Sequence, residues 1–324
     1  MKSPLFKTCV ATTLWIASSL SAFAQGNTEA FFKSTPLQVV IGYGPGGAYD
    51  VYGRTLARHI GRFLPGKPSV SVQNMPGAGS MKASNYIATL APKNGSQIAT
   101  FSRGLIMQPL LDPQGVQYDP LKLEWIGCVA SETSVIFSWA PRNIPSFQDA
   151  YKRDVIVSAS GSGADSAIFP YVINSVLGTK FKVITGYPDA NATLMAVERG
   201  EADGSAGTSW STLRSTRPDW ITGKKITLLA QMGLQKNPTI DAPLILDFAK
   251  TDSDRRVFEL IFSRQTLAYP FTAPQGTPAD RLSAWRLAFD QTMLDSEFKA
   301  EAAKSGLEVD PVSAAKMKDI IARA

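Results

Sequence analysis

A glycine-rich turn between an apolar run and a helix-like run is the feature that most restricts what this chain can fold into. The segment Ile41-Gly-Tyr-Gly-Pro-Gly-Gly-Ala-Tyr-Asp50 follows the strand-like run 37–41 and precedes the helix-like run 51–64. A strand, turn and helix in this order leave free backbone N–H groups and the positive end of a helix dipole at the turn, which suits an anionic group. A second turn, Asn74-Met-Pro-Gly-Ala-Gly-Ser80, follows the next strand-like run. The two turns together predict one anion-binding site.

Strand-like and helix-like runs alternate along the chain, which is typical of an α/β fold with largely parallel sheets. No Pro or Gly cluster is long enough to separate two sequentially independent domains, so we expect lobes joined by strands that cross between them. The predicted strands are 37–41, 70–73, 97–101, 125–129, 135–139, 155–159, 182–185 and 226–230. The predicted helices are 51–63, 80–90, 147–151, 167–177, 190–199, 253–262, 279–294, 296–304 and 313–322.

The first 24 residues have the pattern of a signal peptide. Lys2 and Lys7 precede a largely apolar stretch over residues 9–20, and Ala22-Phe-Ala24 offers the small residues that a signal peptidase accepts. The stretch is shorter than the roughly 20 apolar residues that span a membrane. We therefore expect cleavage near Ala24, export to the periplasm and a soluble mature protein.

The charge balance gives no indication of a nucleic-acid partner. The chain has 33 Lys and Arg against 27 Asp and Glu, a formal net charge of +6, and it lacks a basic run or an interleaving of basic and aromatic residues. This mild positive charge is compatible with attracting anionic small molecules. After export Cys128 would be the one remaining cysteine, and its apolar surroundings predict a buried thiol without an internal disulfide.

Six short motifs follow one another along the chain. They are Ile41-Gly-Tyr-Gly-Pro-Gly-Gly-Ala-Tyr-Asp50, Asn74-Met-Pro-Gly-Ala-Gly79, Tyr118-Asp-Pro-Leu121, Gly186-Tyr-Pro188, Glu198-Arg-Gly-Glu-Ala-Asp203 and Phe271-Thr-Ala-Pro-Gln-Gly-Thr-Pro278. Their order and spacing resemble the Bug family, also called TctC, the extracytoplasmic solute receptors of tripartite tricarboxylate transporters. The resemblance implies a two-lobed, type II-like periplasmic binding protein, in which each lobe is a mixed, largely parallel sheet flanked by helices.

The resemblance also implies how the chain is divided and what it does. Residues 25–128 and 262–324 would form one lobe, and residues 129–261 the other. The lobes would close on a small organic carboxylate and deliver it to the membrane permease subunits of the transporter. The protein would act as a monomer without a cofactor or a metal, and it would not be an enzyme.

In this family the two glycine turns of the first lobe hold a ligand carboxylate through backbone amides and bridging waters, which agrees with the close approach that glycine permits. Asp50 either contacts the ligand or caps the helix expected to start at Val51, and we favour the cap. Ala48, Tyr49 and Met75 depart from the usual family pattern, which leaves the identity of the ligand open. Carried over by position, the binding residues are Tyr43, Pro45, Gly46, Gly47, Ala48, Tyr49 and Asp50 on one side and Asn74, Pro76, Gly77, Ala78 and Gly79 on the other.

A polar turn of the second lobe, Ser158-Ala-Ser-Gly-Ser-Gly-Ala-Asp165, is expected to bind the far end of the ligand. Its hydroxyl and amide groups point to Ser160, Ser162 and Asp165 as the candidate ligand contacts. The same side chains can instead cap the helix that follows, and the two roles are compatible.

Four further residues are candidates for the far end of the ligand. Thr208, Ser209 and Trp210 lie where the family places residues that face the cleft, and Trp210 either stacks on a ligand ring or belongs to the core. Arg103 follows a predicted strand and either forms a forked hydrogen bond with a second carboxylate or lies on the surface. Aromatic or longer acids are candidate ligands because of Tyr43, Tyr49, Phe169 and Trp210.

An enzyme would have few residues from which to build its catalytic site. His59 is the only histidine, and it lies well along the first helix from the turn that it would have to serve, so we predict a residue of the helix face. Gly161-Ser-Gly163 lacks the flanking pattern of a nucleophile elbow, and no His and Cys cluster has metal-ligand spacing. A sensor that presents its ligand to a signalling partner is an alternative to transport, and a periplasmic hydrolase is a less supported one.

Overall fold

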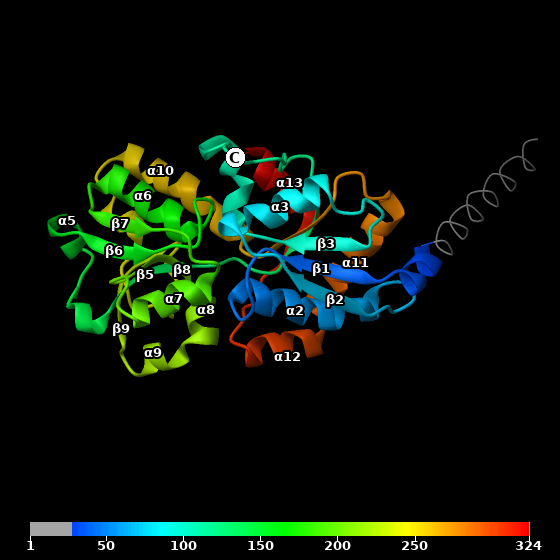
Figure 1. Cartoon of the computed structure of the whole chain (residues 1–324), viewed down its shortest axis with the longest axis horizontal. Helices are drawn as coiled ribbons and strands as arrows, with labels where there is room; N and C mark the ends of the chain where they lie inside the picture. Colours follow the sequence, from blue (N-terminus) through cyan, green and yellow to red (C-terminus); the bar gives the residue numbers. More distant parts are fainter. Residues whose placement is uncertain (1–27, 324) are drawn as a thin grey trace, which may run out of the picture.

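The protein consists of two α/β lobes that lie side by side, as Figure 1 shows. The computed structural model describes residues 28–323, so the predicted signal peptide over residues 1–24 lies outside the described part of the chain. The predicted two-lobed α/β fold is confirmed. Within residues 28–323, no helix is both long enough and apolar enough to span a membrane.

The first lobe contains a six-stranded mixed sheet with the strand order β11-β4-β10-β3-β1-β2. β1 pairs in parallel with β2 and β3, whereas β10 runs antiparallel between β3 and β4. The chain therefore leaves this sheet after β4 and returns to its middle from the second lobe. The strands are β1 (Leu37–Ile41), β2 (Val70–Asn74), β3 (Gln97–Thr100), β4 (Glu124–Cys128), β10 (Pro270–Ala273) and β11 (Val312–Ser313).

The second lobe contains a five-stranded mixed sheet with the order β7-β6-β8-β5-β9. β6 pairs in parallel with β7 and β8, and β5 runs antiparallel to β8 and β9. All of its strands come from one continuous stretch between β4 and β10. They are β5 (Ser134–Trp139), β6 (Val155–Ser158), β7 (Phe181–Ile184), β8 (Gly204–Ser209) and β9 (Ile226–Met232).

Helices cover both faces of each sheet, because alternate residues of a buried strand point to opposite faces. Val39 and Ile41 of β1 pack on one face with residues of α2, α11 and α12, and Val40 packs on the other with residues of α3 and α13. The helices are α2 (Ala48–Ile60), α3 (Met81–Thr89), α4 (Gln108–Leu111), α5 (Asp149–Lys152), α6 (Asp165–Leu177), α7 (Ala190–Glu198), α8 (Trp210–Thr216), α9 (Pro218–Thr222), α10 (Asp252–Ser263), α11 (Ala279–Leu294), α12 (Ser296–Lys304) and α13 (Ala314–Arg323).

The sequence did not indicate β8, although it lies at the centre of the second sheet. Its residues Gly-Ser-Ala-Gly-Thr-Ser are too small and polar for the apolar pattern of a buried strand. The small residues have a structural reason. A Cβ on Gly207 (φ +128°) would lie 2.7 Å from the backbone of Asp165, so the glycine lets the start of α6 pack directly on the strand.

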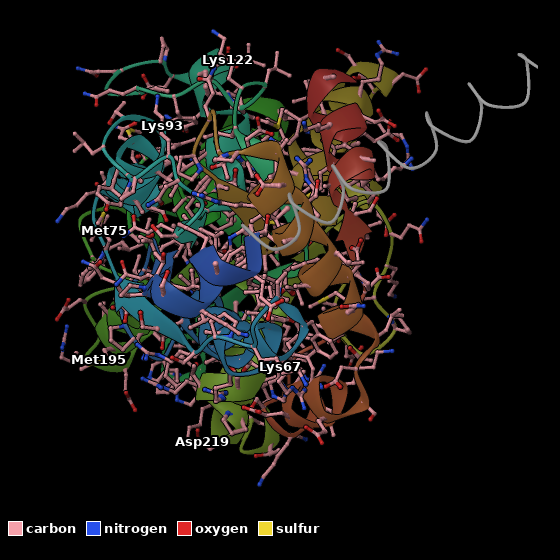
Figure 2. The ribbon with its side chains drawn as sticks, turned by 90° about the vertical axis from the view of Figure 1, so that its right-hand side faces the viewer. Lys67, Met75, Lys93, Lys122, Met195 and Asp219 are labelled. Carbon is pink, nitrogen blue, oxygen red and sulfur yellow. The ribbon has the colours of Figure 1, made fainter. Side chains whose placement is uncertain are left out.

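Charged side chains are spread over the surface of the first lobe. Figure 2 shows Lys67, Lys93 and Lys122 well apart on the side of the molecule that faces the viewer. On this side the positive charge is therefore distributed, not gathered around one point.

Candidate functional site

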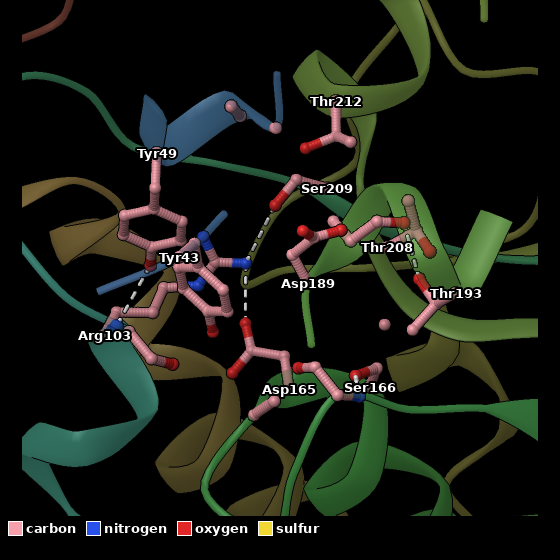
Figure 3. Close-up of a pocket in the computed structure, with 17 residues that line it drawn as sticks. Tyr43, Tyr49, Arg103, Asp165, Ser166, Asp189, Thr193, Thr208, Ser209 and Thr212 are labelled. Atoms are coloured by element: carbon pink, nitrogen blue, oxygen red, sulfur yellow. Dashed lines mark hydrogen bonds and ion pairs between the residues drawn. The ribbon is translucent and has the colours of Figure 1, made fainter. Parts of the chain in front are cut away.

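A cavity lies between the two lobes, at the carboxyl ends of strands from both sheets, which is where open α/β folds bind ligands. It has about 60 Å³ of space for the centres of water-sized molecules, several times the roughly 10 to 15 Å³ that one buried water needs. Nine of its 17 lining residues carry a side-chain hydroxyl group, and Figure 3 shows several of them. The lining residues are Tyr43, Gly47, Ala48, Tyr49, Ser102, Arg103, Ser160, Ala164, Asp165, Ser166, Asp189, Ala190, Thr193, Gly207, Thr208, Ser209 and Thr212.

The first-lobe wall is built by the first glycine turn and the beginning of α2. This helix begins at Ala48, three residues before the predicted start, with Gly47 at its N-cap and no side chain bonded there. The prediction that Asp50 caps the helix is corrected accordingly, because Asp50 lies within the first turn of α2. Its carboxylate accepts a hydrogen bond from the N–H of Gly46 (2.9 Å) and so stabilises the backbone of the first glycine turn.

Asp50 is held as a carboxylate by its neighbours. Burial alone would raise its pKa, but hydrogen bonds from Arg54 (Nε to Oδ1, 2.9 Å), from Asn74 (Nδ2 to Oδ1, 2.7 Å) and from the N–H of Gly46 lower the pKa below its usual value. Asn74 also donates to the carbonyl oxygen of Tyr43 (2.8 Å). The first turn is thus fixed by side chains that lie outside the cavity.

Two tyrosines of the first lobe line the cavity with their rings 4.9 Å apart. The Tyr49 hydroxyl donates to the carbonyl oxygen of Ala268 (2.8 Å) and accepts from the N–H of Arg103 (3.0 Å), so it holds two loops together. Burial raises the pKa of Tyr43 to about 12. Both side chains therefore remain neutral at physiological pH and act as hydrogen-bonding and apolar surface.

The second glycine turn does not line the cavity. Of its predicted binding residues, Gly79 instead packs against the second lobe, where its ideal Cβ would lie 3.2 Å from the N atom of Ala164. Asn74 is directed to Asp50 and Tyr43, as described above. The others that do not line the cavity are Pro76, Gly77 and Ala78, and in the first turn Pro45, Gly46 and Asp50.

The second-lobe wall contains the amino-terminal ends of α6, α7 and α8. Asp165 is the first residue of α6, and Asp189 caps α7 by accepting the N–H of Ala192 (2.8 Å). Ser209 is the N-cap residue of α8. Together with α2, several helix N-termini point their positive dipole ends toward one cavity.

A buried charge cluster joins the lobes next to the cavity. An Arg103 Nη2 atom lies 2.6 Å from the Asp165 carboxylate, and an Arg264 Nε atom lies 3.3 Å from its other oxygen. Arg103 is only 2% exposed, so the interpretation of it as a surface residue is wrong. Burial alone would lower the pKa of Arg103, and Asp165 more than reverses that effect; the pKa of the more distant Arg264 stays lowered by burial.

Three other residues that were expected at the site do not line the cavity. Trp210 is 6% exposed and packs in a core cluster with Val135 and Leu213, which favours its core interpretation over stacking on a ligand. Ser162 is exposed and does not line the cavity. Phe169, expected in the cleft, is fully buried beneath the Arg264 guanidinium (4.7 Å to the ring centroid).

Eight lining residues were not predicted, and most of them start or precede helices of the second lobe. Ser102 lies two residues after the end of β3. Asp189 is the residue before α7, where an Asp followed by a helix is a recognisable cap signal. The remaining six are Ala164, Ser166, Ala190, Thr193, Gly207 and Thr212.

The described lining of the cavity combines side-chain hydroxyl groups with two carboxylates and one guanidinium. Its described lining includes four serines and three threonines but no histidine, cysteine or lysine that could activate them. His59 lies elsewhere, on the face of α2 toward α12, with its Nε2 atom 2.6 Å from Glu301. His59, Asp295 and Glu297 are close enough to share a metal ion, but the Arg62 guanidinium already contacts all three.

A second, larger cavity is lined by residues 131–133 and 233–238, among others. It has about 410 Å³ of space for the centres of water-sized molecules, and none of the predicted site residues lines it. Glu132 lines it and accepts hydrogen bonds from the hydroxyl groups of Ser211 and Tyr269. Burial raises the pKa of Glu132. The two hydroxyl groups show that this carboxyl group already has partners within the protein.

Comparison with known proteins gives matches to solved structures but none to family models or curated proteins. No family model and no curated protein matches this chain. The solved structure of the periplasmic binding protein BugD matches with a TM-score of 0.73 and 21% sequence identity, over 90% of this chain and 94% of that one. The fold is that of the Bug and TctC solute-binding proteins.

Two further structures agree with this fold. MatC from Rhodopseudomonas palustris, solved with bound malate, matches with a TM-score of 0.72 and 15% identity over 90% of this chain and 97% of its own. A TctC solute-binding protein from Polaromonas, solved without a ligand, matches with a TM-score of 0.59 and 17% identity over 90% and 96%. The resemblance drawn from the six motifs is therefore matched by the three-dimensional structure.

Proposed function

We propose that this protein is an extracytoplasmic solute receptor of the Bug/TctC type, which binds a small organic carboxylate between its lobes. The observation that carries the proposal is the convergence of helix N-termini on one cavity. The N-terminus of α2 is open there, because no side chain caps it at Gly47. A carboxylate at this position would accept free N–H groups and gain from the helix dipole.

The fold supports the same proposal. MatC, which shares this fold, was solved with the dicarboxylate malate, although a shared fold alone does not fix a ligand. We further propose that the acid is delivered to the permease subunits of a tripartite tricarboxylate transporter, and that the receptor works as a periplasmic monomer after cleavage near Ala24. The proposed lobes are 25–128 with 262–324, and 129–261.

Closure of the lobes would trap the acid. The backbone of the second turn already meets the loop 161–164 of the opposite lobe, and the Arg103–Asp165 pair joins the lobes through buried charges. Arg103 was a candidate partner for a second ligand carboxylate. Asp165 already forms an ion pair with Arg103, so we propose that the main role of Arg103 is to stabilise the closed arrangement of the lobes. Its Nε and Nη1 atoms have no hydrogen-bond partner among the described residues, and we propose that these two donors contact the ligand.

A test of the carboxylate site uses the open N-cap of α2. Gly47 has a φ of −81° and space around its missing side chain, since the nearest atom to an ideal Cβ is 3.8 Å away. In Gly47→Asp the new carboxylate would occupy the proposed position of the ligand carboxylate. The N-cap position also favours aspartate, so the helix itself should not be harmed. We expect unchanged or increased thermal stability and a loss of acid binding by about tenfold or more, as for other like-charge juxtapositions.

The matched control is Gly47→Asn, which has nearly the same size and capping ability but no charge. Binding is measured by calorimetry after a thermal-shift screen of mono-, di- and tricarboxylates and aromatic acids, because a ligand that binds only the folded state raises its melting temperature. A weaker effect of Asn than of Asp supports the site. Equal, wild-type affinity of both variants would place the carboxylate elsewhere, and a screen in which no acid raises the melting temperature would contradict the proposed function.

A further inference from the structure

The two walls of the cavity differ in how their helix N-termini are used. On the first-lobe wall, the N-terminus of α2 carries no capping side chain. On the second-lobe wall, α6 begins with Asp165 and α7 is capped by Asp189. The second lobe therefore already supplies carboxylates at the positions where its helices would bind an anion.

Only one of these two carboxylates has cationic partners. Asp165 lies against Arg103 and Arg264, at 2.6 and 3.3 Å. Asp189 forms no ion pair within 4.0 Å with any described cationic side chain, and its carboxylate accepts a hydrogen bond from the N–H of Ala192. Figure 3 shows its side chain among the residues that line the cavity. A ligand in the cavity therefore meets an aspartate that no arginine or lysine neutralises.

The position of Asp189 relative to the first turn limits how a ligand can be placed. An ideal Cβ on Gly44 would lie 2.1 Å from Asp189 Oδ2, so this oxygen touches the first glycine turn across the interface between the lobes. A second carboxylate of the ligand near this point would face an unpaired negative charge, which is unfavourable in a desolvated site. An ammonium group there would gain a charge-assisted hydrogen bond instead.

We propose that the receptor is selective for acids that also carry an ammonium group, with Asp189 as the residue that recognises it. The ligand carboxylate would lie at the N-terminus of α2, and the ammonium group would donate to Asp189 and to hydroxyl groups such as that of Thr208. This inference rests on the proposed function and names the class of its ligand. It differs from a preference for dicarboxylates, which the second wall disfavours.

The experiment compares acids that share a four-carbon chain and differ in one group. Calorimetry is carried out with 2-aminobutanoate, 4-aminobutanoate, butanoate and succinate. We expect at least one amino acid to bind wild type about tenfold more tightly than butanoate and succinate, the scale of a charge-assisted contact. Tighter binding of succinate or butanoate would overturn the inference, whereas no binding of any of the four acids, or of any acid in the wider screen, would contradict the proposed function itself.

The variant Asp189→Asn separates recognition from capping. Asparagine caps helices about as well as aspartate, so α7 is preserved while the negative charge is removed. We expect the amino acid to lose about tenfold or more in affinity, with butanoate unchanged or improved. The control is Asp295→Asn, a change at another capping aspartate, on α12 and outside the cavity. If Asp189→Asn leaves the ratio of affinities as it is in wild type and in Asp295→Asn, Asp189 does not recognise the ammonium group.

Discussion

The two glycine turns of the first lobe are alike in sequence and different in use. The first turn, residues 42–47, contributes to the cavity and ends at the open N-cap of α2. The second, residues 74–80, contributes nothing to the lining and packs its backbone on residues 161–164 of the other lobe. Glycine permits close backbone approach in both turns. The two turns differ in what their backbones meet: the first turn borders a cavity, and the second contacts the opposite lobe.

The backbone conformations of the turns differ as well. In the second turn Ala78 and Ser80 have left-handed φ values of 47° and 83°, as does Gly79 between them at 62°. Such values are unfavourable for residues with a Cβ. In the first turn only Gly46 has a positive φ (89°). The strained turn is therefore the one at the contact between the lobes, and the relaxed one faces the cavity.

The largest effect is expected where the second turn meets the other lobe. In Gly161→Ala the new Cβ would lie 2.4 Å from the backbone N atom of Gly79, which cannot move aside as a side chain can. We expect closure to be opposed by about 1 to 3 kcal/mol, the range for overpacking. Ligand affinity would fall accordingly, and X-ray scattering would report a larger radius of gyration. Wild-type affinity and dimensions would show that the lobes do not need this contact.

A smaller effect is expected beneath the first turn. In Asp50→Asn the acceptor of the Gly46 and Arg54 hydrogen bonds loses its charge, and we expect a loss of about 1 to 2 kcal/mol in the free energy of unfolding at pH 7, reduced because the Arg54 side chain is 41% exposed. Urea unfolding measures it.

The pH dependence of this variant has a definite sign. The pKa of Asp50 is lower in the folded protein, so its contribution is present above the unfolded value of about 3.9 and is lost as the pH falls through the folded pKa. The difference between wild type and Asp50→Asn should shrink in that acidic range. A difference that is constant with pH would mean that the lost charge is not its cause.

Relief of strain in the second turn is expected to be weaker and of opposite sign. Ala78→Gly removes a Cβ from a residue at φ 47°. We expect stabilisation by up to about 1 kcal/mol, because the relief of backbone strain is partly offset by the greater freedom of glycine in the unfolded chain. Thermal unfolding measures the change. A clear destabilisation would show that the Ala78 methyl group makes a contact that matters more than its conformation.

The smallest effect is expected at the relaxed turn. Gly47→Ala places a methyl group at φ −81° with its nearest neighbour 3.8 Å away, and we expect a change within about 0.5 kcal/mol in the free energy of unfolding. If urea unfolding instead showed a loss of about 1 kcal/mol or more, the range of overpacking, the description of the first turn as relaxed would be wrong.

Much of the fold was accessible from the sequence because its strands and helices carry regular apolar patterns. The predicted helices 279–294 and 296–304 match α11 and α12 in full, and β1 matches its predicted bounds. Two of the strands that were not predicted, β8 and β10, lie inside their sheets, yet β8 consists of small residues and β10 begins with proline. Their places are fixed by neighbouring strands, which a local pattern does not report.

Some residues of the candidate site could be predicted from the sequence, but the contacts that define their roles could not. The first turn and Arg103 stand beside recognisable strand ends, so the sequence could mark them. The role of Arg103 depends on Asp165, a residue 62 positions later, and that pairing exists only in three dimensions. The same holds for the failure of the second turn to reach the cavity, because local composition is equally suited to holding an anion and to packing against another backbone.

The burial of Cys128 makes this protein suitable for site-specific labelling. The thiol is 0% exposed, and burial raises its pKa to about 12, so thiol reagents at neutral pH should leave it unmodified. It is also the one cysteine within residues 28–323. A cysteine introduced at an exposed position, such as Ser162 in the second lobe, could then carry a single fluorophore, and movement of the lobes on binding would become an optical signal.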